Sequence, residues 1–339
     1  MAVNNITPEV SWRSFDFRSE PLTELRSMYE LTYGAKVDES VWEWKYVKNP
    51  DVGGIRMIVA VADKRIVGAT TRMPADILVN NEVRKAYFNV DSMVHPDFRR
   101  LGIMQSLYGY TASMMPIQYS KGTNPGMYGL LKKIGYRDVL PNTFMVKYLS
   151  IPKLLLNKIR VYSARTGAPP EVRDDCGEKG FIRAERFGPE FDEFRSRVSP
   201  GFGGVPVKDS ERMNWRYNAI PHRQYHVFYR KKGGRIVSVV VMRIKEVSGS
   251  IVDILWDRAE GDEPQSTIRF CAGFLKSSGA LKITCWATLD DLRACLRRNG
   301  FIDNNETPRF SVFAPNGMDV FANGGKIHFV EGDGDSEYL

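Results

Sequence analysis

The stretch VHPDFRRLGIMQSL, residues 94–107, is the starting point for predicting the fold, because a strand pattern ends in it and a helix pattern begins. Pro96 disfavours helical backbone in the residue before it, which sets the end of the strand. Arg99, Arg100 and Gly102 occupy the turn, and apolar residues then recur at helical spacing. A helix N-terminus presents unpaired N–H groups and a partial positive charge, so this basic turn favours a bound phosphate.

Several blocks of sequence recur in the same order in the two halves of the chain, which indicates a tandem duplication. They are WKYVKNP (44–50) and WRYNAIP (215–221), the Ile-Val pairs at 66–67 and 236–237, NVDSM (89–93) and IVDIL (251–255), and LLKKIGYRD (130–138) and CLRRNGFID (295–303). We therefore expect a first domain over residues 1–150, a linker over 151–179 and a second domain over 180–339.

The repeated unit combines helices with a β-hairpin. In the first copy the pattern predicts helices over residues 21–33, 40–46, 102–115 and 128–134 and strands over residues 57–62, 66–72, 84–94 and 144–148. Asp63 and Lys64 are expected to form the hairpin turn. The predicted fold class is α+β, with two tandem domains that each hold a mixed β-sheet flanked by helices.

The composition narrows the class of partner. The chain has 339 residues, with 48 Lys and Arg against 40 Asp and Glu, and its net charge of +8 favours an acidic partner. Because the basic residues are scattered, we expect neither nucleic acid nor a membrane as that partner. We see no signal-peptide pattern and no apolar run of membrane-spanning length, so we expect a cytoplasmic protein. The histidines and cysteines show no ligand spacing, which indicates no metal site.

Residues 94–107 resemble the coenzyme A pyrophosphate loop of the GCN5-related N-acetyltransferases (GNAT), usually written R/Q-x-x-G-x-G/A. Arg99 and Gly102 match the loop, whereas Met104 stands where Gly or Ala is usual. LLKKIGYRD (130–138) resembles a later element of the same family, a short helix that ends in Lys-x-Gly-Tyr/Phe. The resemblance implies that the first domain is an acyltransferase domain that uses acetyl-CoA or another short acyl-CoA.

The second domain lacks the coenzyme loop. RAEGDEPQSTIRF (258–270) stands in its place, and Glu260, Asp262 and Glu263 would repel a pyrophosphate. We therefore expect one coenzyme site, in the first domain. The second, degenerate GNAT-like domain is expected to serve as a scaffold and as a wall of the acceptor site.

The resemblance also implies which residues bind the coenzyme. They are Met93, Val94, Arg99, Arg100, Leu101, Gly102, Ile103, Met104 and Asn124. Backbone N–H groups around Met93 and Val94 are the expected donors to the oxyanion that develops during transfer. Asn124 is expected to contact the pantetheine, although the sequence Asn-Pro-Gly also forms turns.

Acyl transfer to an amine requires a base for the ammonium proton and a donor for the departing thiolate. Asp91 is the first candidate base, and His95, a residue type that titrates near neutral pH, is the second. Because Asp253 matches Asp91 in the copy without the loop, a purely structural role for Asp91 stays open. The family commonly has a tyrosine at the position of Leu131, so Tyr128, one turn earlier on the same helix face, is the expected donor.

Trp42 and Ser92 are the expected contacts with the acceptor. Trp44 and Trp215 occur in both copies, and each is expected to anchor a helix to its own sheet. WEWKYVKNP (42–50), together with the coenzyme loop and the closing IHFVEGDGDSEYL, is similar to bacterial tandem-domain acyltransferases of amino-sugar nucleotide and surface-polysaccharide synthesis. That similarity implies a small acceptor, a nucleotide-linked amino sugar, which is acylated directly in a ternary complex.

Two other functions stay open at this stage. Tandem copies of this fold also transfer aminoacyl groups to peptides, and a chain of this kind can bind acyl-CoA as a regulator without catalysis. The sequence determines neither the acyl chain length, nor the sugar and nucleotide, nor the oligomeric state.

Overall fold

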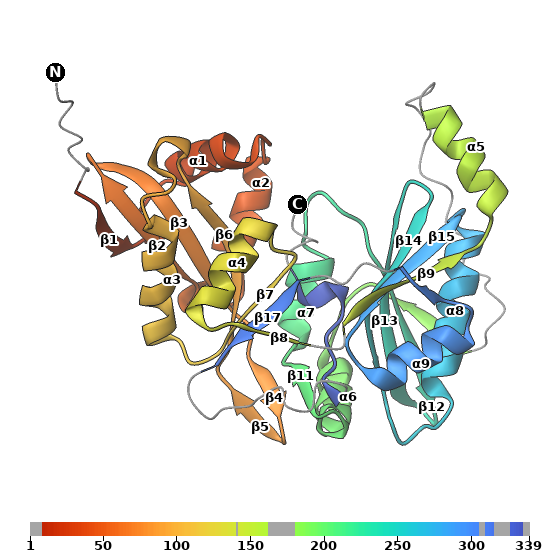
Figure 1. Cartoon of the computed structure of the whole chain (residues 1–339). Coiled ribbons are helices and arrows are strands. Elements are labelled where there is room, and N and C mark those ends of the chain that lie inside the picture. The colour runs from red at the N-terminus through yellow and green to blue at the C-terminus, as the bar shows by residue number, and fades with distance from the viewer. Residues whose placement is uncertain (1–8, 140–141, 162–179, 305–308, 315–325, 335–339) are drawn as a thin grey trace.

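The computed structural model describes residues 9–139, 142–161, 180–304, 309–314 and 326–334. They form two halves that lie side by side, each a β-sheet with helices on its faces (Figure 1). The α+β class predicted from the sequence is confirmed. Along these residues no helix combines the length and the apolarity needed to cross a bilayer.

The sheet of the first half has the strand order β1-β2-β3-β6-β7-β17-β8. Its strands are β1 (Ser11–Ser14), β2 (Arg56–Ala62), β3 (Arg65–Pro74), β6 (Tyr87–Val94), β7 (Gln118–Lys121), β17 (Phe310–Phe313) and β8 (Arg137–Asp138). β2 and β3 form the predicted hairpin, and its turn residues Asp63 and Lys64 have φ values of +49° and +62°. A turn with two positive φ values matches the right-handed twist of the strands that it joins.

The sheet of the second half has the order β10-β12-β13-β14-β15-β9-β16. Its strands are β10 (Phe181–Ala184), β12 (His226–Lys232), β13 (Arg235–Lys245), β14 (Ser248–Trp256), β15 (Lys282–Ala287), β9 (Thr143–Tyr148) and β16 (Ile302–Asp303). A small third sheet has the order β11-β4-β5, with β11 (Gly204–Pro206), β4 (Ile77–Val79) and β5 (Glu82–Arg84). Since β11 pairs with β4, this sheet joins the two halves.

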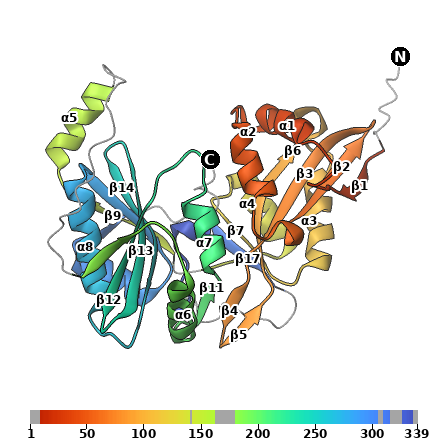
Figure 2. The same ribbon diagram turned by 180° about the vertical axis from the view of Figure 1, so that it is seen from behind.

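The helices cover both faces of each large sheet. They are α1 (Thr23–Tyr33), α2 (Glu39–Trp42), α3 (Ile103–Met114), α4 (Pro125–Ile134), α5 (Ile151–Val161), α6 (Pro189–Val198), α7 (Ser210–Tyr217), α8 (Glu263–Ser277) and α9 (Asp290–Arg298). In the first half α1 and α2 pack on one face and α3 on the other, and in the second half α6 and α8 pack on opposite faces (Figure 2). The helices predicted over 21–33, 102–115 and 128–134 correspond to α1, α3 and α4.

The two large sheets exchange one strand each. β9 pairs with β15 and β16 in the second sheet, and β17 lies between β7 and β8 in the first. The strand predicted over 144–148 therefore exists, but its assignment to the first copy's sheet is wrong. A strand edge accepts any strand that offers N–H and C=O groups, so the sequence pattern does not specify the partner. In the predicted linker, α5 begins directly after β9, and residues 162–179 lie outside the described residues.

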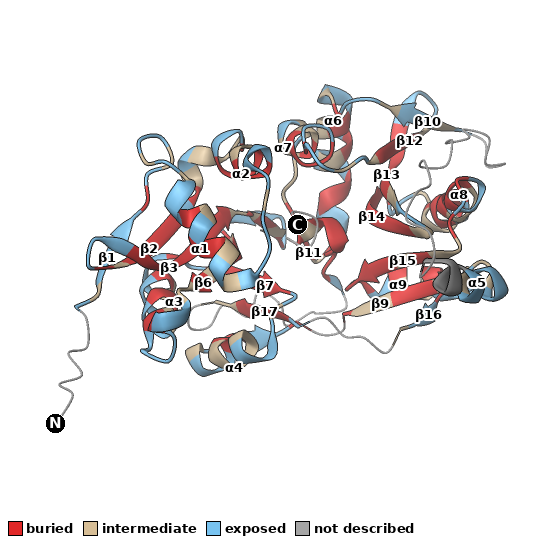
Figure 3. Cartoon of the chain, turned by 90° about the horizontal axis from the view of Figure 1, so that it is seen from above, coloured by how far each residue is buried: buried red, intermediate tan, exposed pale blue. Residues whose placement is uncertain are grey.

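Trp44 and Trp215 hold the two halves together. Their rings stack with centroids 4.7 Å apart, and each indole N–H donates to the backbone carbonyl of the other, at 2.7 and 2.8 Å. Our expectation that each anchors a helix to its own sheet is wrong, because the repeated motif pairs with its own copy across the interface. Buried residues fill the interior of both halves and the region between them (Figure 3).

Candidate active site

The predicted coenzyme loop joins β6 to α3 at the surface. Arg99, Arg100 and Leu101 are exposed in it, and Arg100 has a φ of +67°. The Arg99 guanidinium lies across the ends of two elements, where it donates to the carbonyls of Val94 at 3.5 Å and Thr32 at 3.4 Å. These long bonds leave the guanidinium available to an incoming anion at the surface.

The α3 N-terminus is suited to a phosphate. Gly102 precedes the helix with a φ of +75°, no side chain caps this end, and a Cβ built on Gly102 would have no atom within 4 Å. The first-turn N–H groups have no acceptor inside the helix and point outward. Ile103 is buried and Met104 packs between α3, α4 and the sheet, so among these three residues only backbone groups are offered to a ligand.

One edge of β6 is left without a strand partner over most of its length among the described residues. β6 and β7 pair only at the two residues that begin β6, up to Phe88, and then diverge. The His95 N–H donates to Val67 of β3 at 2.9 Å, so by alternation the Val94 N–H points away from β3 and the Met93 N–H points toward it. Of the two predicted oxyanion donors, only Val94 therefore faces the free edge.

Asp91 lies in a β-bulge of β6, with a φ of +45°, opposite the stretch of β3 where the register shifts. Its side chain is 5% exposed and accepts a bond from Lys45 Nζ at 2.7 Å and another from the Tyr46 hydroxyl. Lys45 and Tyr46 come from the π-helical turn Glu43–Val47 that follows α2. These two bonds fix the direction of the carboxylate.

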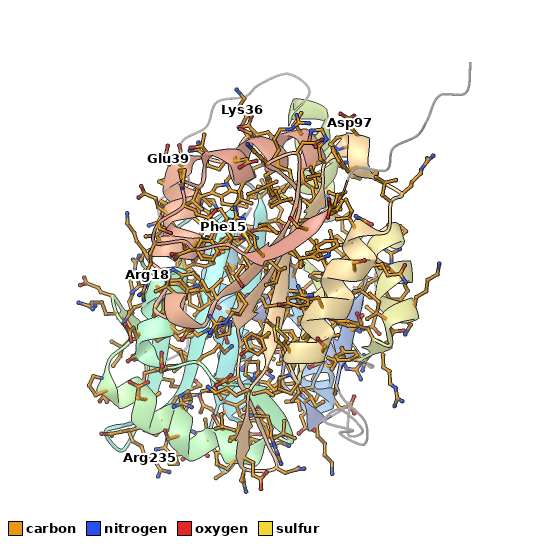
Figure 4. The ribbon with its side chains drawn as sticks, turned by 90° about the vertical axis from the view of Figure 1, so that its left-hand side faces the viewer. Phe15, Arg18, Lys36, Glu39, Asp97 and Arg235 are labelled. Carbon is orange, nitrogen blue, oxygen red and sulfur yellow. The ribbon has the colours of Figure 1, made fainter. Side chains whose placement is uncertain are left out.

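His95 is placed at a surface turn. Its Nδ1 accepts from the Asp97 N–H at 3.3 Å and caps the 3₁₀ turn that follows β6. Asp97 marks this turn in Figure 4, at the same end of the molecule as Lys36, which lies between α1 and α2, and Glu39, which begins α2. No contact among the described residues joins His95 to Asp91.

The two predicted α4 residues are engaged locally. Asn124 caps α4, since its Oδ1 accepts from the Met127 N–H at 2.9 Å, which is the turn-forming role that the Asn-Pro-Gly sequence allowed. The Tyr128 hydroxyl donates to Asp138 Oδ2 at 2.8 Å, and this bond raises the pKa of Tyr128. Tyr128 is therefore directed at β8 rather than at Asp91.

The two predicted acceptor contacts lie on different sides of the sheet. Trp42 is 3% exposed and packs against Tyr29 and Tyr46, so its ring has no face for a sugar, and we do not retain that prediction. The Ser92 hydroxyl points toward α3, where it lies 2.8 Å from Thr70 Oγ1 and 2.8 Å from the Tyr108 hydroxyl. Alternation along the strand had left that direction open.

In the second half, a glutamate side chain occupies the N-terminus of α8, the helix that corresponds to α3. Glu263, in the first turn of α8, is fully buried. It is bonded to Arg230 at 3.2 Å, to Lys232 at 3.0 Å and to the Ser238 hydroxyl at 2.9 Å. Its negative charge takes the place that a phosphate would have beside a basic helix N-terminus.

The free edge of β14 is also filled. β14 and β15 pair only as far as Ile251, and the segment 327–334 runs into the space beyond. There His328 Nε2 donates to the Ile254 carbonyl at 2.6 Å. Gly332 passes so close that a Cβ built on it would collide with the Tyr217 hydroxyl.

Lys208 fastens this segment. Its Nζ lies 2.8 Å from Asp253 and 2.9 Å from Asp333, and Tyr217 donates to the same Asp253 oxygen at 2.8 Å. Burial lowers the pKa of Lys208, but the two carboxylates outweigh burial and leave that pKa above its usual value. Asp253 and Tyr217 of the second half therefore correspond to Asp91 and Tyr46 of the first. Residues 327–334 occupy the space beside β14 that is equivalent to the free edge of β6.

A small pocket of about 20 Å³, room for about one water molecule, lies between the halves. Residues of the first half line one side, and residues of the second half, three of them basic and one acidic, line the other. They are Met73, Ala75, Phe88 and Tyr119 against Pro206, Val207, Lys208, Arg212, Met213, Arg216, Gly332 and Asp333. Arg212 spans the halves, since its guanidinium lies 2.7 Å from Asp51 and donates to the Pro74 carbonyl.

Sequence reasoning did not identify Lys45 and Tyr46 as partners of Asp91. Both stand inside WKYVKNP, and the repeat has Arg216 and Tyr217 at the equivalent positions. A basic residue followed by a tyrosine in both copies was the available signal.

Residues 17–136 match the family model described as Acetyltransferase (GNAT) domain. This range contains β6, the loop and α3. None of the curated proteins matches the sequence at a significant level.

Several solved structures share the fold over both halves. A GCN5-related N-acetyltransferase from Anabaena variabilis has a TM-score of 0.66 at 11% identity, covering 95% of this chain and 85% of its own. A GCN5-related N-acetyltransferase from Kribbella flavida has a TM-score of 0.61 at 12% identity, covering 91% and 72%. The N-myristoyltransferase of Saccharomyces cerevisiae, with bound myristoyl-CoA, has a TM-score of 0.56 at 12% identity, covering 90% and 78%.

Proposed function

We propose that the chain is an N-acyltransferase that moves an acyl group from acyl-coenzyme A to a primary amine at the free edge of β6, a proposal supported by the match of residues 17–136 to the Acetyltransferase (GNAT) domain model. The observation that carries the proposal is the uncapped N-terminus of α3 beside an unpaired strand edge. Arg99, Arg100 and Gly102 surround that helix end. In the second half, Glu263 occupies the equivalent helix N-terminus and residues 327–334 occupy the equivalent strand edge. This difference supports a single coenzyme site.

Val94 and Asp91 are the groups that we assign to the reacting atoms. The Val94 N–H faces the free edge and is available to the thioester oxygen. Asp91 lies in the bulge three residues earlier, where Lys45 and Tyr46 hold its carboxylate. An oriented carboxylate there can bind the ammonium form of the acceptor and take its proton, directly or through one water molecule.

For the acceptor, we infer a small amine that carries negative charge, and specifically a nucleotide-linked amino sugar. The net charge of +8 agrees with an anionic acceptor. The likeness of the central loop and its flanking motifs to enzymes of amino-sugar nucleotide synthesis supports the sugar.

The test is a thiol-release assay with acetyl-CoA and longer acyl-CoAs against nucleotide-linked amino sugars, free amino sugars and peptides. Asp91→Asn is compared with Asp253→Asn, which alters the equivalent bulge in the half without a coenzyme site. We expect release that requires one acceptor class and falls about a hundredfold in Asp91→Asn. Coenzyme affinity, measured by calorimetry, is expected to stay unchanged, and Asp253→Asn is expected to keep the transfer rate.

The other outcomes separate the alternatives. If thiol release requires a peptide, the acceptor is a peptide amine and not an amino sugar, as in a tandem peptide acyltransferase. Coenzyme binding that depends on Arg99, with no release for any acceptor, would make the chain a regulator that senses acyl-CoA. Equal loss in Asp91→Asn and Asp253→Asn would show that Asp91 braces the sheet.

A further inference from the structure

Tyr108 of α3 places a hydroxyl against the β6 bulge, and neither the sequence motifs nor the proposed base accounts for it. The side chain is 1% exposed, and its hydroxyl lies 2.8 Å from Ser92 Oγ. Ser92 Oγ is in turn 2.8 Å from Thr70 Oγ1. Ser92 belongs to the β6 bulge and is the neighbour of Asp91 in sequence.

Arg72 of β3 lies beneath this hydroxyl chain and is fully buried. Its guanidinium carbon is 4.2 Å from the centre of the Tyr108 ring. It donates to Thr70 Oγ1, Thr111 Oγ1 and Gln118 Oε1, each at 2.7 Å. All of these partners are neutral, and no ion pair among the described residues includes Arg72.

A buried cation without a counter-charge favours negative charge at the nearest site that can acquire it. The hydroxyls of Thr70, Ser92 and Tyr108 connect the guanidinium to the bulge. The Tyr108 ring also lies over the guanidinium, a cation–π contact that holds the ring beside Ser92.

The bulge directs its two polar side chains to opposite faces of the sheet. Asp91 contacts Lys45 and Tyr46, which pack on the α1 and α2 side, whereas Ser92 contacts Tyr108 on the α3 side. A direct acyl transfer needs such a division, because the amine loses a proton while the sulfur gains one. The base and the donor for sulfur must not neutralise each other.

We propose that Tyr108, held by Ser92 and Arg72, donates the hydrogen bond and the proton to the departing thiolate; this assignment rests on the acyltransferase function proposed above. The amine nitrogen bonds to the carbonyl carbon, and the carbon–sulfur bond breaks with its electron pair on sulfur. The Tyr108 proton passes to sulfur and gives the free thiol. The proton that the amine loses leaves through the base to solvent, from which Tyr108 is reprotonated by way of Ser92.

The side chains of α4 are not placed to donate a proton to the thiolate, which leaves this role to α3. Leu131 is fully buried in one small cluster with Tyr108 and Tyr136, so the helix offers an apolar side chain at this point. The Tyr136 hydroxyl is already bonded to Asn89 at 2.9 Å and to Gln118 at 3.0 Å. Tyr128 is held by Asp138. Of Tyr108, Tyr128 and Tyr136, Tyr108 is the one whose hydroxyl is bonded to the bulge, whereas the Tyr33 and Tyr46 hydroxyls are bonded to the Ser92 carbonyl and to Asp91.

The experiment measures single-turnover acyl transfer and coenzyme affinity for Tyr108→Phe, Ser92→Ala and the double variant. Tyr110→Phe is the control, because it removes a hydroxyl from the exposed side of the same helix. We expect Tyr108→Phe to slow transfer about a hundredfold while coenzyme affinity stays within about twofold. Ser92→Ala should slow transfer as well, and the double variant should be no slower than Tyr108→Phe, because the two hydroxyls act as one chain.

Each outcome decides between the two proposals. If the wild-type protein transfers acyl groups and Tyr108→Phe keeps its rate, the assignment of Tyr108 is overturned and the proposed function stands. If losses in the two single variants multiply in the double variant, Ser92 does not act through Tyr108, and the chain as proposed is overturned. A wild-type protein that releases no thiol with any acceptor overturns the proposed function and this inference with it. Melting temperatures of all variants identify any loss that comes from unfolding.

Discussion

Replacing Lys208 with methionine should strongly destabilise the second half. The change keeps the length and much of the volume of the side chain and removes only its charge. In the structure that charge lies between Asp253 and Asp333, whose side chains are 5% and 3% exposed. Without this charge, the buried carboxylate of Asp253 in β14 faces that of Asp333 in the segment 327–334, and the lysine no longer neutralises them.

The magnitude follows from what each carboxylate retains. Breaking a buried ion pair by removing one partner typically costs about 3–5 kcal/mol. Asp253 keeps the Tyr217 hydroxyl and Asp333 keeps the Val330 N–H, both at 2.8 Å, so neither loses every donor. We therefore expect a loss of about 3 kcal/mol in the free energy of unfolding.

Urea unfolding of Lys208→Met measures this loss, and Lys231→Met is the matched control. Lys231 pairs with Glu190 at the surface, where side-chain exposures are 32% and 52%, so its removal should cost less than about 1 kcal/mol. Since the pKa of Lys208 is raised on folding, its contribution is fully present below the unfolded value of 10.5 and is lost as the pH rises through the folded value. Equal effects of the two substitutions at pH 7 would refute the reasoning, as would a wild-type advantage that persists unchanged far above pH 10.5.

Three further predictions concern the glycine at α3, the carboxylate at α8 and the buried histidine. Gly102→Ala and Gly34→Ala should both cost about 1 kcal/mol, since both glycines have positive φ and open space around them, but only Gly102→Ala should weaken coenzyme binding in calorimetry. Glu263→Gln should lower unfolding free energy by about 2 kcal/mol through its bonds to two cations, with coenzyme affinity unchanged; tighter coenzyme binding would contradict the single-site interpretation. Burial holds the pKa of His328 at about 4 against 6.5 for the unfolded chain, so the unfolded state binds more protons between these values and stability falls on acidification through that window. His328→Phe should remove that part of the acid sensitivity in urea titrations at several pH values, and an unchanged acid limb would contradict it.

The backbone of the proposed coenzyme loop was predictable because its signals are local. A proline at the strand end, arginines in the turn and a glycine before a helical pattern determine the backbone over a few residues, and the structure has β6, the turn and α3 there. The hairpin turn at Asp63 and Lys64 was predictable for the same reason.

Side-chain roles within the site were predicted less well. Met93 and Val94 were indistinguishable in sequence, because only the pairing of His95 with Val67 shows which N–H faces the free edge. Tyr108 has the apolar neighbours of a core residue, and its hydroxyl acquires a role only where Ser92 turns toward it at the bulge. A bulge depends on the register between two strands, which the period of one strand does not contain.

By itself, the sequence determined the α+β class, the internal repeat and the basic helix N-terminus, since each follows from residues within one turn, strand or helix. Only the tertiary structure decided that β9 and β17 change sheets, that Trp44 meets Trp215, and that residues 327–334 close the second ligand space. Backbone N–H and C=O groups at a strand edge are alike in every strand, so local pattern predicts a strand but does not choose its neighbour. That choice is made by burial over the whole chain, when the two copies pack on each other and only certain edges remain within reach.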